Sequence, residues 1–186
     1  MEDVAASADF KLGRHEPGAG MVAHRYANVY HREKGRLVIA PKRDQIGLFL
    51  ALARQIDGPF RFVYVLLGPF GRYAEGRYEL SVRLDHESLE LLLDQFRLFF
   101  QGDARHHVFI GNDSPEPLLF YDQHDLIYAY GPAERYVPLL ESQGLTPGVP
   151  EMPSPHSHHI RPEFDVVAEE LLSGRDWKTG PLLESD

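Results

Sequence analysis

The chain contains no cysteine, and this absence excludes several kinds of chemistry. Without thiols it has no disulfide framework, no thiolate metal site and no cysteine nucleophile. Of its 186 residues, 43% are hydrophobic and 25% are charged, which is the composition of an ordinary globular domain that folds without covalent staples. A reducing, cytoplasmic location is therefore the simplest expectation.

Long apolar runs are also absent. No stretch approaches the roughly 18 uninterrupted apolar residues from which a membrane-spanning helix is built. The first ten residues, MEDVAASADF, carry acidic side chains where a secretory signal carries basic ones, and no apolar run follows them. These two observations predict a soluble cytoplasmic protein with no membrane partner.

Positive charge is scarce, since the formal net charge is −9 and residues 58–186 hold 10 Lys and Arg against 21 Asp and Glu. General nucleic-acid binding is not expected, because phosphate contacts require a concentrated positive footprint. The acidic surface instead suits a basic protein partner. One basic stretch, residues 31–43 (HREKGRLVIAPKR), is interpreted either as a solvated hairpin or as a clamp for an anion.

Hydrophobic periodicity predicts strands that come mostly in hairpins. The expected strands are 22–30, 37–40, 60–68, 77–84, 107–111, 118–122 and 126–130. The expected helices are 46–56, 85–102, 132–144 and 161–174. Strands in hairpins with helices between them predict an α+β fold rather than a doubly wound one.

The predicted fold is a single globular α+β domain over residues 1–186, with a mixed, largely antiparallel sheet of about six to eight strands and three to four helices. Residues 1–20 have little periodicity and are expected to form an irregular arm. Residues 144–161 are expected to form a proline- and histidine-rich connection within the domain.

Three histidines gather in that connection, within the segment PSPHSHHIRPEFD. In an extended segment, side chains two residues apart project to the same side, so His156 and His158 share a face. Imidazole binds zinc and other divalent transition metals, which makes His156, His158 and His159 candidate metal ligands. Three other interpretations stay open: the rings satisfy backbone carbonyls of a proline-rich segment, they are simply exposed to solvent, or they act in catalysis or contact a substrate.

The segment YDQHDLIYAYG, residues 121–131, is a second candidate site. Asp122 or Asp125 could orient His124 as an acid–base pair at a loop tip, or these residues could complete a metal site. His107, at the start of an expected strand, could also complete it. The alternative is an ordinary hairpin turn, because Asp is common in turns.

Complete catalytic motifs are missing from the sequence. No serine stands in a GxSxG elbow, no glycine-rich loop ends in GK[ST], and no HExxH pattern is present. The leading hypothesis is therefore a non-catalytic interaction domain, such as an inhibitor or immunity-type partner of a basic protein, or one that self-associates. The alternative is a small metal-dependent enzyme, a hydrolase, that uses the histidine cluster. A weaker third hypothesis is a small-ligand binder that uses the basic stretch.

Overall fold

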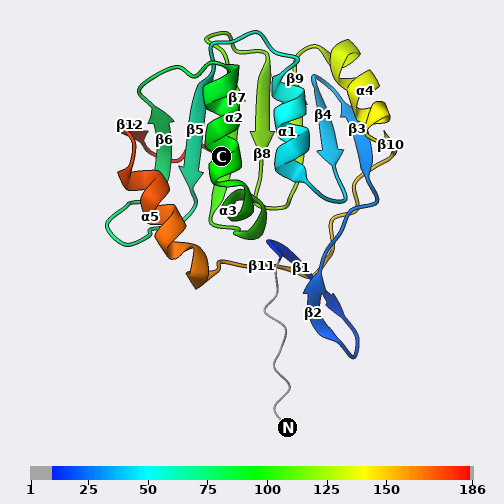
Figure 1. Cartoon of the computed structure of the whole chain (residues 1–186). Helices are drawn as coiled ribbons and strands as arrows, with labels where there is room; N and C mark the ends of the chain where they lie inside the picture. The colour runs from blue at the N-terminus through cyan, green and yellow to red at the C-terminus, as the bar shows by residue number, and fades with distance from the viewer. Residues whose placement is uncertain (1–9, 185–186) are drawn as a thin grey trace.

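A computed structural model describes residues 10–184. Nine strands form one sheet (Figure 1). Their spatial order is β10 (Thr146–Pro147), β3 (Val29–Glu33), β4 (Arg36–Ala40), β9 (Ile127–Tyr130), β8 (Leu118–Tyr121), β7 (His106–Gly111), β5 (Arg61–Leu66), β6 (Gly76–Leu80) and β12 (Trp177–Gly180). All neighbours are antiparallel except β10 and β3.

Helices pack on the sheet. They are α1 (Gln45–Ala53), α2 (His86–Gln95), α3 (Arg97–Gly102), α4 (Ala133–Ser142) and α5 (Asp165–Ser173), the last preceded by a 3-10 turn, Pro162–Phe164. Figure 1 shows α1 and α2 lying across one face of the central strands. The largest hydrophobic cluster joins this face to the helices and contains many fully buried aromatic rings, such as Phe49, Phe62 and Phe99.

Two aspartates cap the N-terminal ends of helices α1 and α2. The Asp44 Oδ1 atom accepts a hydrogen bond from the Gly47 amide at 3.2 Å, and Asp85 Oδ1 accepts one from the Ser88 amide at 2.8 Å. Each bond satisfies a backbone donor that has no partner inside its helix.

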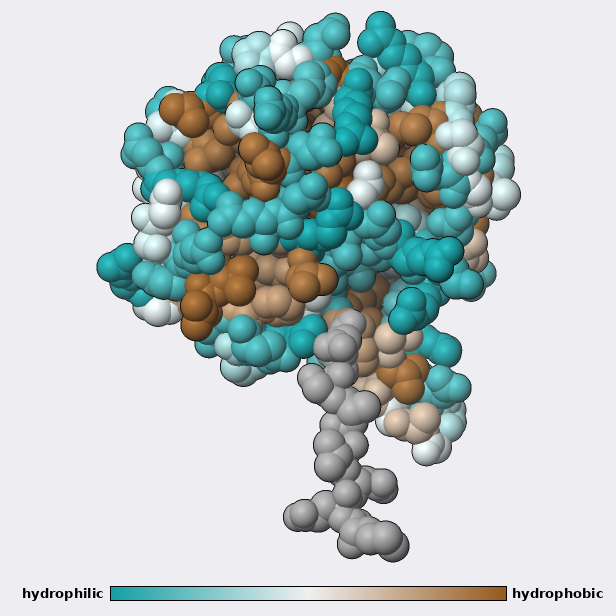
Figure 2. All heavy atoms as spheres, in the orientation of Figure 1, coloured by the Kyte–Doolittle hydropathy of each residue, from teal (hydrophilic) through white to brown (hydrophobic). Residues whose placement is uncertain are grey.

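From outside, the helical side of the molecule is largely hydrophilic with separate hydrophobic areas (Figure 2).

The opposite face of the sheet carries a row of aromatic rings. Phe109 stacks on Phe120 with 4.3 Å between ring centroids, and Phe120 stacks on Tyr128 at 5.3 Å. Alternation along β7, β8 and β9 places these side chains away from the buried Val108, Leu119 and Ile127. The row ends close to the β8–β9 turn, since the Tyr128 hydroxyl lies 3.5 Å from Asp122 Oδ2.

A second, three-stranded sheet has the order β11 (His156–His158), β1 (Leu12–Glu16), β2 (Gly20–Ala23), and all its strands are antiparallel. In Figure 1 these strands lie at the lower edge of the molecule, near the α3 end of the large sheet. The sheet thus brings the first described strand beside a strand from near the other end of the chain.

The predicted α+β class with a mostly antiparallel sheet is confirmed, but the predicted numbers of elements are too low. Residues 10–184 form nine strands in one sheet, three in another, and five α-helices. Strand β10 has only two residues, and β12, WKTG, lacks an apolar alternation that would reveal it. The single helix expected over 85–102 is divided at Phe96 into α2 and α3, and Phe96, Phe99 and Phe100 are all buried.

The expected irregular arm is wrong where it can be compared, because residues 12–16 and 20–23 form a hairpin. Residues 1–9 lie outside the described part of the chain. The strand expected at 22–30 is also wrong: β2 ends at residue 23 and β3 begins at residue 29, after Asn28 with a φ of 65°. Within residues 10–184, no helix combines the length and the apolar character that crossing a bilayer requires.

Candidate metal centre

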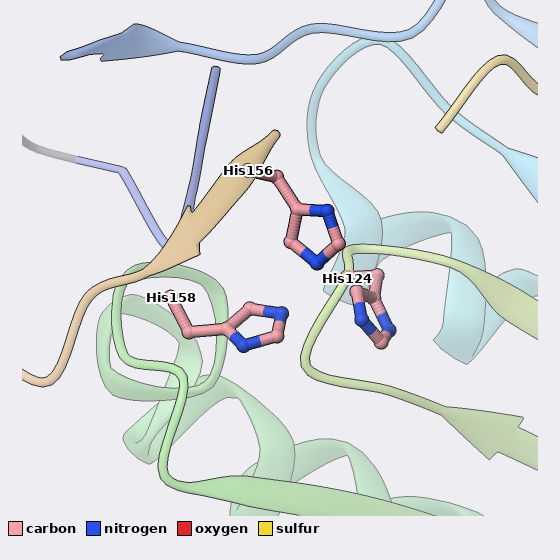
Figure 3. A group of neighbouring side chains, drawn as sticks. All are labelled: His124, His156 and His158. Atoms are coloured by element: carbon pink, nitrogen blue, oxygen red, sulfur yellow. The ribbon is translucent and has the colours of Figure 1, made fainter. Parts of the chain in front are cut away.

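Two histidines leave the same side of strand β11. This strand pairs with β1, with His156 opposite Arg14, Ser157 opposite Gly13 and His158 opposite Leu12. Alternation along an extended strand puts His156 and His158 on one face and Ser157 on the other. Both histidines are exposed, and Figure 3 shows their rings pointing the same way, toward the β8–β9 turn.

The β8–β9 turn supplies the third histidine. Asp122 is buried, and its Oδ1 atom accepts hydrogen bonds from the amides of His124 at 2.8 Å and Leu126 at 2.9 Å. Asp125 closes the turn with a φ of 63°, a left-handed conformation that Asp tolerates better than most residues. The turn is therefore built by its aspartates, and it presents the His124 ring to β11.

The three rings converge. One ring nitrogen from each of His124, His156 and His158 can be chosen so that all three atoms lie within 4.8 Å of one another (Figure 3). Ring centroids are 4.7 Å apart for His124 and His158, and 5.1 Å apart for His156 and His158. Nitrogens bound to one tetrahedral zinc ion at 2.0–2.1 Å are about 3.3 Å apart. Small ring rotations would thus bring these nitrogens to coordination distance.

Hydrogen bonds favour one orientation of two of these rings. His124 Nδ1 lies 2.9 Å from Asp122 Oδ2, and His156 Nδ1 lies 2.9 Å from the carbonyl oxygen of Pro153. A carboxylate or a carbonyl can only accept, so each Nδ1 carries the proton and donates. The lone pair of each ring is then on Nε2, as in metal-binding histidines held by an outer carboxylate or carbonyl.

The third ring is also suited to bind a metal. Desolvation of its ring by the surrounding groups, together with the nearby rings of His124 and His156, lowers the pKa of the solvent-accessible His158 to about 4. His158 is therefore neutral at physiological pH, and a neutral imidazole is the form that binds a metal ion.

Lys11 connects the β8–β9 turn, which carries His124, to the segment that carries the β11 histidines. Its ammonium is completely buried and donates to the carbonyl oxygens of Asp122 at 2.7 Å and Phe100 at 3.3 Å. Its own carbonyl accepts from the His159 amide at 3.0 Å, next to the β11 histidines. The ammonium also lies 3.9 Å from the centroid of the Tyr121 ring. Burial lowers the pKa of Lys11 to about 8.

Tyr26 also holds the β8–β9 turn in place through a hydrogen bond. Its hydroxyl donates to the carbonyl oxygen of His124 at 3.0 Å, and the ring itself is buried. The sequence pattern drew no attention to Lys11 or Tyr26. The one available signal was a lysine between Phe10 and Leu12, which is an unusual place for a solvated charge.

Of the other predicted site residues, His159 and Asp125 face elsewhere. His159 Nε2 lies 2.9 Å from the Ser157 hydroxyl, and its ring packs edge-on against Phe10. Asp125 Oδ1 accepts a 2.6 Å hydrogen bond from the Tyr121 hydroxyl. Burial raises the pKa of Asp125, although Lys11 opposes this shift. The structure therefore groups His156 and His158 with His124 and Asp122, apart from His159.

His107, the other residue considered from the sequence, lies beneath the cluster. It is 5% exposed, its ring packs edge-on against Phe120, and burial lowers its pKa to about 4. Neither of its ring nitrogens has a hydrogen-bond partner within the described residues. His107 is therefore a neutral, buried neighbour of the cluster.

The basic stretch ends at a separate cavity of about 420 Å³. Lys42 and Arg43 line it together with Arg25, but so do Asp44 and Asp125. Its walls carry both signs of charge, so the anion-clamp interpretation stays a prediction.

Comparisons with protein-family models, with curated proteins and with solved structures found no match to this chain. The geometry of the cluster is therefore the main guide to function.

Proposed function

We propose that the chain binds one divalent transition-metal ion, with zinc as the reference ion, through His124, His156 and His158, and that it is a small metal-dependent hydrolase. The observation that carries the proposal is the approach of three imidazole nitrogens to within 4.8 Å of one another. Two of these rings have their second nitrogen engaged by an oxygen, which leaves Nε2 for the metal.

Three protein ligands favour a catalytic site over a structural one. Structural zinc sites have four protein ligands, whereas catalytic sites have three and keep one position for water or substrate. His156 and His158 are exposed, so this position is accessible to solvent. His124, His156 and His158 would hold the ion, and the chemistry it would supply there is activation of a water molecule for hydrolysis.

The first test is metal binding by untagged protein purified without chelator or nickel resin. Calorimetric titration with zinc is expected to show one ion bound per chain. Alanine at His124, His156 or His158 should weaken zinc binding on the order of 100-fold each, because each substitution removes a ligand. His159→Ala is the matched control, since its ring faces Phe10 and Ser157, and it should bind zinc like the wild type.

Equal zinc affinity in His158→Ala and His159→Ala would contradict the metal site. The hydrolytic part is tested separately with p-nitrophenyl acetate, which requires no knowledge of the natural substrate. Turnover is expected with zinc or cobalt bound and should be lost in His158→Ala. If zinc binds stoichiometrically but no ester, amide or phosphate ester tested is hydrolysed in a metal-dependent way, the hydrolase proposal is overturned. The protein would then be a metal-binding protein without this activity.

Asp122→Asn tests how the outer carboxylate positions His124. The amide can still offer one oxygen to the backbone amides of the turn, but it then faces His124 Nδ1 with a second donor. The protonated nitrogen of His124 loses its acceptor, so zinc affinity should fall by about 10- to 100-fold. Calorimetric titration measures this loss, and a melting curve without metal shows whether the turn remains folded. Unchanged affinity in a folded variant would exclude Asp122 from the site.

A further inference from the structure

A cavity of about 320 Å³ adjoins the histidine cluster. It lies where the chain leaves β5, and its walls include residues 66–70, Ala104 and Ile160. His158 forms part of the same wall, and so does Gln123, which precedes His124 in the β8–β9 turn. The cavity therefore opens beside one candidate metal ligand and next to a second.

The walls are mainly apolar. Leu67, Pro69, Phe70, Ala104 and Ile160 contribute hydrocarbon surface, and Ile160 is 63% exposed despite its size. The volume is at the lower end of the roughly 300–1,000 Å³ that small-molecule sites occupy. It is large enough for one small ring or a short branched chain.

Among the described residues, Arg105 is the one arginine or lysine in the wall, and its charge is already neutralised. Arg105 is 4% exposed, and its guanidinium bonds to both carboxylate oxygens of Asp103 at 2.8 and 3.0 Å. It also contacts Asp165 Oδ1 at 2.8 Å and lies over the Phe70 ring at 4.8 Å from the centroid. With two carboxylates beside it, Arg105 adds little attraction for an anion, so the cavity favours an uncharged group.

We propose that this cavity holds the uncharged apolar group, a small aromatic ring or a short branched alkyl chain, of a ligand whose polar end binds the metal ion at His158. The inference rests on the proposed metal centre and deepens it by naming the substrate class. For a hydrolase, the substrate would be an ester or amide with an apolar group next to the scissile carbonyl.

Hydroxamic acids test this pairing without knowledge of the natural substrate, because the hydroxamate end binds the metal directly. Acetohydroxamate and benzohydroxamate are titrated into the zinc-loaded protein and followed by calorimetry. Benzohydroxamate should bind at least about tenfold more tightly than acetohydroxamate, because its phenyl ring moves from water into the apolar cavity. A 4-carboxybenzohydroxamate, which carries a charge into the apolar wall, should lose this advantage.

Gly68→Phe is designed to fill the cavity. Gly68 lines it, a β-carbon there meets nothing within 4 Å, and its φ is outside the left-handed region. Benzohydroxamate should then bind no better than acetohydroxamate, whose own affinity is retained. Gly180→Phe, on β12, is the matched control because a β-carbon there also meets open space. A second variant, Ile160→Ser at the exposed part of the wall, should reduce the benzohydroxamate advantage with little risk to folding.

The outcomes separate the two proposals. If zinc does not bind, the metal centre itself fails. If zinc and acetohydroxamate bind but benzohydroxamate gains nothing, the metal centre stands and the apolar cavity is overturned. An advantage for benzohydroxamate that survives both Gly68→Phe and Ile160→Ser would also overturn it, because the ring would then lie elsewhere. If 4-carboxybenzohydroxamate binds more tightly than benzohydroxamate, the proposal of an uncharged group is overturned, because the cavity would then favour an anionic group.

Discussion

Zinc at about 100 times its dissociation constant is expected to raise the free energy of unfolding by about 2.7 kcal/mol, because an ion that binds only the folded state stabilises it by mass action. The ligands come from a turn of the large sheet and from β11 of the small one, so the unfolded chain does not hold them together. Urea denaturation in zinc-buffered and in EDTA-containing solution measures the difference.

The same experiment on two variants gives its control. His158→Ala should keep only about 0.4 kcal/mol of the zinc effect, because its zinc affinity is expected to be about 100-fold weaker. His159→Ala should keep most of the zinc effect, even if loss of its contact with Phe10 lowers the baseline stability. Zinc stabilisation of similar size in both variants would show that the ion acts at another place.

Lys11→Met should destabilise the protein by about 2 kcal/mol and weaken zinc binding as well. The substitution keeps the length and apolar stem of the side chain but leaves the buried carbonyl of Asp122 without its lysine donor, whereas the carbonyl of Phe100 keeps His106 Nε2 at 3.3 Å. The loss of both lysine hydrogen bonds destabilises the folded state, and avoiding the burial of an ammonium offsets part of this loss. The weaker zinc binding follows because Lys11 holds the β8–β9 turn next to β11.

Urea denaturation of the metal-free protein measures the stability change, and calorimetry measures the change in zinc affinity. Lys178→Met, at an exposed position of β12, is the matched control and should change neither quantity appreciably. If Lys11→Met unfolds at the wild-type urea concentration, the hydrogen bonds of Lys11 do not stabilise the contact between the β8–β9 turn and β11.

Local patterns were enough to predict the central strands of the large sheet, from β4 to β6 in its spatial order. The apolar run of β5 and the hairpin of β8 and β9 are visible in the sequence because burial imposes its period on neighbouring residues. The β1–β2 hairpin was missed because LGRHE and GMVA are short, and only part of β1 is buried. Strand β12 was missed for the same reason.

The candidate site was only partly accessible from the sequence. Period-two alternation put His156 and His158 on one face, and the turn made His124 and Asp122 a plausible pair. What no local pattern contains is the approach of β11 to that turn, because it depends on pairing with β1 and on Lys11. The interaction-domain hypothesis, with a basic protein or a second copy as partner, stays a prediction.

The place of β11 in the small sheet has a kinetic consequence. Two of the three proposed ligands sit on an edge strand of three residues, held through its pairing with β1. The third ligand belongs to a hairpin inside the nine-stranded sheet. If this edge strand peels away, both ligands leave in one event while the large sheet stays intact. The lifetime of the bound ion would then be set by how often that short strand detaches, not by the global unfolding of the protein.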